Sequence, residues 1–153
     1  MGYLSLLAFI AGAAIAIQAS MNAQLGVLLK SSMVGTSIAF LVSCIFTITA
    51  MMLSTKHYPQ IGDIKSVPIY LWFTGGALSA TGVGLFYYLI PKMGVGSMMS
   101  YALSGQILVA IVASHFGWFN LPEKPLDMIK AIGAIALISG VVLLNLDSNN
   151  VHG

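Results

Sequence analysis

Residues 3–29 read YLSLLAFIAGAAIAIQASMNAQLGVLL, a stretch without a charged side chain that ends at Lys30. A helix of about 20 apolar residues crosses a bilayer core of about 30 Å. A run of this length is too long for a strand, and apolar and polar residues do not alternate along it. The stretch therefore predicts a membrane-spanning helix. It also raises the question of why such a helix contains the amide side chains of Gln18 and Asn22.

The composition of the whole chain agrees with this prediction. Of 153 residues, 58% are hydrophobic and 7% are charged, whereas a soluble domain is about 25% charged. The net charge of +2 is too small for the clustered basic face of a nucleic-acid-binding protein. The single cysteine, Cys44, excludes a disulfide within the chain. We therefore expect an integral membrane protein that contacts the lipid bilayer and no nucleic acid.

Apolar runs predict five spans, at about residues 3–29, 34–53, 68–90, 97–119 and 126–146. The expected fold is an all-α integral membrane protein with one five-helix membrane domain, residues 1–153. The first run is interpreted as a retained helix, because MGYLSLLAF lacks the basic residue of a signal peptide and the run exceeds a signal core. The acidic residues Asp63, Glu123, Asp127 and Asp147 are all expected in loops or at span ends.

The lysines give only a weak signal for orientation. With five spans, the side of the N-terminus receives Lys56, Lys65, Lys124 and Lys130, and the other side receives Lys30 and Lys92. Loops rich in lysine and arginine tend to stay cytoplasmic. Because the two sides differ by only two lysines, we expect insertion in both orientations.

Amide side chains near the middle of two spans are the candidate functional residues. Gln18 and Asn22 share one helix face because they lie four residues apart, and Gln106 is similarly central in the fourth span. An amide without a partner in hydrocarbon costs several kcal/mol. Two interpretations remain open, namely hydrogen bonds between helices and a site for a solute on a permeation pathway. Gln24 lies on another face and is expected to be structural.

Small residues form stripes that allow helix backbones to approach closely in lipid. The candidate packing residues are Gly12 and Ala16 in the first span, Gly76, Ala80 and Gly84 in the third, and Gly133 and Gly140 in the fifth. These stripes could serve packing within one subunit or contact between subunits.

The remaining side chains argue against an enzyme. Ser104 and His115 could suggest a serine hydrolase, but eleven residues of helix separate them by about 16 Å. No cluster of metal ligands is visible in the sequence, so we expect no metal and no cofactor. Tyr101, with Trp72, Tyr87 and Tyr88, could surround a cation or belong to the aromatic belts at span ends.

Three segments carry a resemblance to a known family: IQASMNAQLG (17–26), PKMGVGSMMSYALSGQILVAIVASHFGW (91–118) and LPEKPLDMIKAIGAIALISGVVLL (121–144). They resemble the five-helix YdcZ family of the drug/metabolite transporter superfamily over nearly the whole chain. The second span departs from the family pattern at Ser43, where a glycine is expected.

The resemblance implies a multi-pass protein of the bacterial inner membrane that exports small molecules. It also implies dual topology and an antiparallel homodimer, in which inverted subunits share a midplane cavity. The expected substrate is a small neutral, zwitterionic or weakly hydrated cationic molecule, with Gln18, Asn22, Gln106 and Tyr101 as binding residues. The alternative function is that of an accessory or assembly subunit that does not transport.

Overall fold

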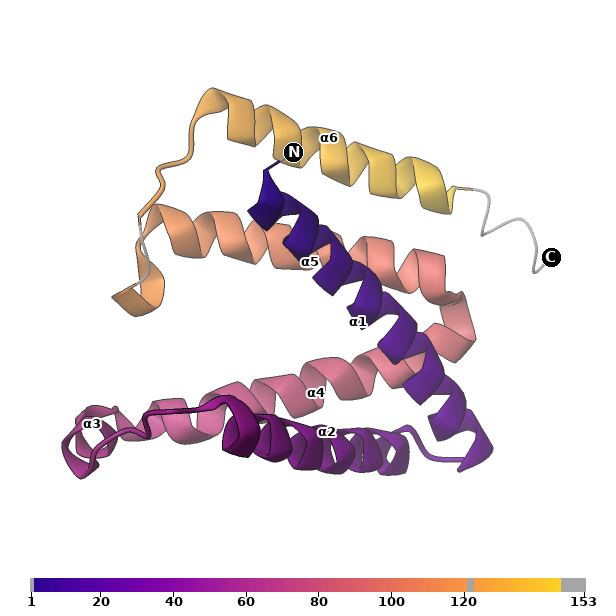
Figure 1. The fold of residues 1–153 in the computed structure, drawn as a ribbon. Helices are drawn as coiled ribbons and strands as arrows, with labels where there is room; N and C mark the ends of the chain where they lie inside the picture. The colour runs from indigo at the N-terminus through magenta and orange to yellow at the C-terminus, as the bar shows by residue number, and fades with distance from the viewer. Residues whose placement is uncertain (1, 121–122, 147–153) are drawn as a thin grey trace. The chain divides into compact units, whose positions relative to one another are not determined.

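Five long helices dominate the computed structural model, which describes residues 2–120 and 123–146. In chain order the helices are α1 (Tyr3–Leu28), α2 (Ser32–Ser54), the short α3 (Ile61–Ser66), α4 (Ile69–Met93), α5 (Val95–His115), the 3-10 turn η1 (Trp118–Asn120) and α6 (Met128–Asn145) (Figure 1). All but α3 and η1 are long and apolar enough to cross a membrane. The expectation of five spanning helices is therefore confirmed, and the described ranges contain no strand.

The chain divides into two compact units, Met1–Met93 and Gly94–Gly153, which are called unit 1 and unit 2 below. The grouping of all five helices into one domain stays a prediction. The acidic residues Asp63, Glu123 and Asp127 lie in α3 or in loops, as expected, whereas Asp147 lies outside the described residues.

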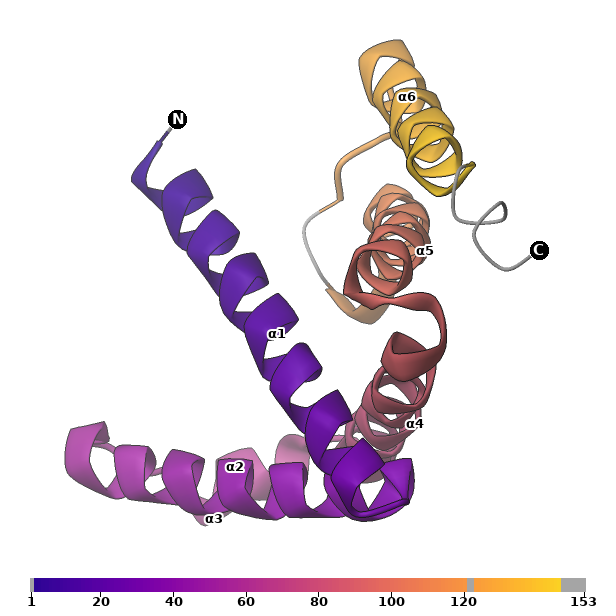
Figure 2. The same ribbon diagram turned by 90° about the vertical axis from the view of Figure 1, so that its right-hand side faces the viewer.

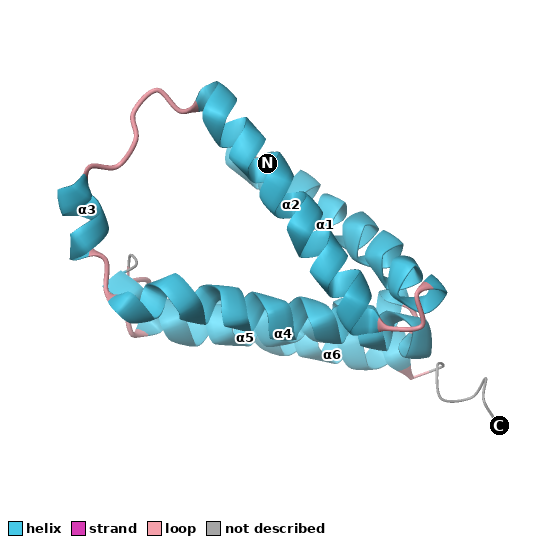
Figure 3. Cartoon of the chain, turned by 90° about the horizontal axis from the view of Figure 1, so that it is seen from below, coloured by secondary structure: helices cyan, strands magenta, loops and turns pink. Residues whose placement is uncertain are grey.

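The helices of unit 1 converge at one end and spread apart at the other. The C-terminus of α1, the N-terminus of α2 and the C-terminus of α4 meet, and the opposite ends diverge (Figures 2 and 3). The buried residues of unit 1 gather near the meeting point: Ala19, Ala23 and Gly26 of α1, Gly35 and Thr36 of α2, and Gly84, Tyr87 and Ile90 of α4. Unit 1 is therefore tightly packed at this end, which we call the converged end.

Two glycines that the sequence analysis did not select set the crossing of α1 and α2. A Cβ atom added to Gly35 would lie 3.0 Å from both the Cα and the N atoms of Gly26. Contacts this short with backbone leave no room for a side chain, so the helices approach this closely only because both positions are glycine.

The turn between α1 and α2 is closed by a Schellman motif. The N–H of Ser31 donates to the carbonyl of Gly26 at 2.9 Å, and the N–H of Lys30 donates to the carbonyl of Val27 at 3.0 Å. Lys30 has a φ of 54°, a left-handed conformation that glycine normally occupies in this motif. The Ser31 hydroxyl then accepts from the N–H of Val34 and caps α2.

In unit 2, α5 ends earlier than the expected span because the chain turns at Gly117. The fourth span was expected to reach Phe119, but α5 ends at His115. Gly117 has a φ of 60°, and an added Cβ would lie 2.6 Å from the Cγ of Glu123. A residue with a side chain would be strained here both by its backbone and by this contact. The turn therefore needs a glycine.

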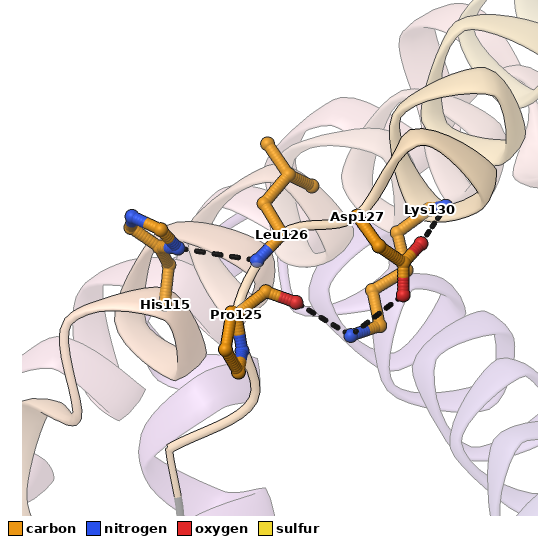
Figure 4. A network of polar contacts seen from close by, with 5 residues as sticks. All are labelled: His115, Pro125, Leu126, Asp127 and Lys130. Carbon is orange, nitrogen blue, oxygen red and sulfur yellow. Dashed lines mark hydrogen bonds and ion pairs between the residues drawn. The ribbon is translucent and has the colours of Figure 1, made fainter.

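Polar contacts then lead the chain into α6 (Figure 4). The Nδ1 atom of His115 accepts a hydrogen bond from the N–H of Leu126 at 3.1 Å. The Asp127 carboxylate caps α6 by accepting from the N–H of Lys130 at 2.8 Å, and this bond lowers the pKa of Asp127. The Lys130 ammonium lies 3.3 Å from the same carboxylate and donates to the carbonyl of Pro125 at 2.7 Å.

Candidate functional site

The two amides predicted to share a face of α1 meet on a single hydroxyl of α4. The Nε2 atom of Gln18 donates to the Tyr87 hydroxyl oxygen at 2.8 Å, and the Nδ2 atom of Asn22 donates to the same oxygen at 2.9 Å. Tyr87 is only 1% exposed. One turn of helix separates Gln18 from Asn22, so both can reach the same point on the neighbouring helix.

This cluster of Gln18, Asn22 and Tyr87 is not saturated. A phenol can donate its own proton while it accepts two hydrogen bonds, and no described atom accepts from the Tyr87 hydroxyl. The amide oxygens of Gln18 and Asn22 also lack partners in the described residues; the Gln18 side chain is exposed, and the Asn22 oxygen is not a buried unsatisfied atom. The cluster therefore offers accessible oxygen acceptors together with one hydroxyl donor. Neutral and cationic groups that carry N–H or O–H donors suit such acceptors better than anions do.

Sequence reasoning placed Tyr87 only among several aromatic residues and missed its role as the common acceptor. The signal that could have found it is the α4 stripe of Gly76, Ala80 and Gly84. Tyr87 lies three residues beyond Gly84 and therefore on the same face of the helix as this stripe. Gly84 itself lies against α2, since an added Cβ would be 3.6 Å from the Oγ1 atom of Thr36.

The other two predicted binding residues, Tyr101 and Gln106, lie on α5 in unit 2. Both side chains are exposed, and neither has a hydrogen-bond partner among the described residues of its own unit. Five residues of helix turn through 500°, so these side chains point roughly 140° apart around α5. They therefore do not share a face of α5. Their role in binding stays a prediction.

Between α2 and the stripe of α4 lies a pocket of about 470 Å³. It is lined by Thr36, Ser37 and Phe40 of α2 and by Gly76, Ser79 and Ala80 of α4, among others. Gly76 has no neighbouring atom within 4 Å of an added Cβ. Gly76 and Ala80 therefore border a hollow of the size that small ligands occupy, and they do not bring α2 and α4 into contact there.

The remaining packing candidates have few or no close neighbours among the described residues of their own units. Gly12, Gly133 and Gly140 have no described atom within 4 Å of an added Cβ, and Ala16 is half-buried. A stripe that is open within its unit remains available to other surfaces, so a role in packing stays a prediction for these residues.

Unit 2 contains a polar contact that the sequence analysis did not identify. The Nδ2 atom of Asn145 in α6 donates to the Ser100 hydroxyl in α5 at 3.0 Å and to the carbonyl of Val141 at 2.7 Å. Asn145 is only 7% exposed, and its Oδ1 atom is buried without a partner in the described chain. Its place at the end of the last span gave no sign that it pairs with α5.

A family model described as "Putative inner membrane exporter, YdcZ" matches residues 3–143. No curated protein and no solved structure gave a significant match. The described residues contain no group of histidine, cysteine, aspartate or glutamate that could hold a metal ion.

Proposed function

The chain belongs to the YdcZ family of the inner membrane, and from that premise we propose that it exports a small neutral, zwitterionic or weakly hydrated cationic molecule. The family is one of membrane exporters and not of enzymes. The family and the five apolar helices together make this chain a multi-pass inner-membrane protein. The proposed path is a cavity near the midplane that two inverted copies of the chain share.

The observation that carries the proposal is the incomplete hydrogen bonding of the Gln18, Asn22 and Tyr87 cluster. A purely structural pair of helices in lipid gains most when every polar group is satisfied within the protein. Here the two amides use their N–H groups on Tyr87, and their oxygens stay accessible. Gln18 lies about 4 Å along the axis from the middle of α1, where accessible polar groups are costly and commonly mark a solute path.

Two features support a second, inverted copy. The lysine distribution orients the chain only weakly, and Gln106 of α5 is an exposed amide in a spanning helix. An amide at that position is stabilised if it faces water, a solute or another polar chain instead of lipid. An antiparallel pair would also supply the inverted repeat on which secondary transporters rely for alternating access.

The transport test compares Gln18→Leu with Gln24→Leu in reconstituted vesicles. Gln24 is the matched control, because it is an exposed glutamine of the same helix that lies about 120° away from Gln18. With tetraphenylphosphonium and a panel of zwitterionic amines as probes, we expect Gln18→Leu to abolish movement and Gln24→Leu to retain it. Cross-linking in detergent should show the same dimer for both variants. Equal transport by the two variants, or loss of the dimer in Gln18→Leu alone, would assign Gln18 to packing.

A separate experiment tests the inverted pair. Reporters fused to the C-terminus should show comparable cytoplasmic and periplasmic populations, and two or three lysines added to one side should shift the balance. A strongly one-sided result for the unmodified chain would exclude an antiparallel homodimer of this chain alone.

A further inference from the structure

A second pocket, of about 340 Å³, lies at the converged end of unit 1. It is bordered by Lys30, Ser31 and Ser32 from the turn between α1 and α2, and by Tyr88, Pro91 and Lys92 from α4. None of the lining residues is acidic. The pocket is therefore positively charged. Tyr87 also lines it, so the pocket adjoins the cluster of Gln18, Asn22 and Tyr87, but neither amide residue is part of its lining.

Both lysines of the pocket keep their charge available to a ligand. The one ion pair within residues 2–120 and 123–146 joins Lys130 to Asp127 in unit 2, so neither Lys30 nor Lys92 is neutralised by a described carboxylate. The Lys92 ammonium lies 3.6 Å from the centre of the Tyr88 ring. An aromatic face attracts an ammonium group without removing its net charge, so Tyr88 holds Lys92 at the pocket while leaving it cationic.

Lys30 is presented by a fixed piece of backbone. The two hydrogen bonds of the Schellman motif hold it at a φ of 54°, where a glycine would avoid the steric cost that lysine bears. The adjacent Ser31 and Ser32 form the start of α2, whose first N–H groups add partial positive charge on the same side. One cation from the turn after α1, a second from α4 and the start of α2 thus surround one pocket.

The position of the pocket points to its ligand. Lys30 directly follows α1 and Lys92 lies in the last turn of α4, and both border one pocket at the ends of helices long enough to span a bilayer. The ends of spanning helices lie at the bilayer surface, so the pocket is expected near the depth of the phospholipid phosphates. Basic pockets between spanning helices at this depth bind anionic headgroups. We propose that Lys30 and Lys92 form a binding site for a phosphate group, carried by an anionic phospholipid or by a free phosphate compound. The site goes beyond the proposed export function and does not depend on it.

The test measures lipid binding to the full chain in detergent by native mass spectrometry. The double variant Lys30→Gln with Lys92→Gln is compared with Lys56→Gln with Lys65→Gln, which removes the same charge from the other end of unit 1, outside the pocket. A lysine near a phosphate surface contributes about fivefold in affinity, so we expect the pocket variant to bind phosphatidylglycerol roughly 25-fold more weakly. We expect the control variant to stay within about twofold of the unmodified chain.

Two further measurements distinguish a lipid from a free phosphate compound as the ligand, and test whether a lysine variant that loses affinity still folds. Competition by inorganic phosphate identifies the phosphate group itself as the ligand, whereas binding that only phosphatidylglycerol supports identifies the lipid. Lys30→Gly should lose affinity about fivefold while the helices are retained, because glycine fits the left-handed position. Equal losses in both double variants, an unchanged affinity in the pocket variant, or equally tight binding of phosphatidylcholine would overturn the proposal.

Discussion

Replacing Tyr87 by phenylalanine tests the central contact of unit 1. The change removes the one oxygen that accepts from both Gln18 and Asn22 and keeps the buried ring. Hydrogen bonds between helices in membranes contribute about 0.6 kcal/mol each on average and at most about 1.7 kcal/mol. Two such bonds predict a loss of roughly 1.2 kcal/mol in the free energy of unfolding, with an upper limit near 3.4 kcal/mol.

The structure favours the lower part of that range. Gln18 is exposed and Asn22 is half-buried, so in Tyr87→Phe the freed amides can bond to water in the proposed cavity in place of remaining unsatisfied. We therefore expect about 1 kcal/mol.

The assay is reversible unfolding by sodium dodecyl sulfate in mixed micelles. Tyr70→Phe is the matched control, because Tyr70 lies in the same helix, is exposed, and has no side-chain hydrogen bond in the described structure. In a double-mutant cycle, Tyr87→Phe should cost about 0.6 kcal/mol less when Asn22 is already leucine. If Tyr87→Phe and Tyr70→Phe lowered stability equally, or if the cycle showed no coupling, the hydrogen-bonded cluster would not exist in the folded protein.

Two further predictions concern backbone contacts and pH. Gly35→Ala should lower the free energy of unfolding of unit 1 by about 1–3 kcal/mol, since its Cβ would press on the backbone of Gly26. The control, Gly12→Ala, lies in open space and should be neutral or stabilising by up to about 1 kcal/mol. Similar losses of stability for the two variants in the same unfolding assay would contradict the close crossing of α1 and α2. For Asp127, the Lys130 N–H lowers the pKa of the folded carboxyl below its unfolded value of about 3.9. Its stabilisation is therefore present above about pH 4 and lost as the pH falls through the folded pKa. The protection of the Lys130 amide against exchange, measured relative to the intrinsic rate at each pH, should fall in acid, and Asp127→Asn, which keeps a good cap, should remove that dependence. An unchanged acid response in Asp127→Asn would assign the effect to another group.

The sequence by itself determined the spanning helices and the need for a polar environment around the amides. Each helix satisfies its own backbone hydrogen bonds, so a long apolar run is sufficient to specify a span in lipid. The boundaries were less certain, because they depend on local contacts. The fourth span ended at His115 and not near Phe119 because Gly117 turns the chain against Glu123.

Only the tertiary structure decided which faces meet. In lipid, an apolar face gains little hydrophobic energy by packing against another helix, so hydropathy does not mark the interface. The stripes of small residues predicted surfaces that could pack, but Gly76 borders a pocket, and the close crossing uses Gly26 and Gly35. Gln18 and Asn22 were recognisable from their position on one face of α1, whereas their acceptor Tyr87 lies 65 or more residues further along the chain. A contact over that separation forms when α1 and α4 pack, and no local pattern of residues encodes it.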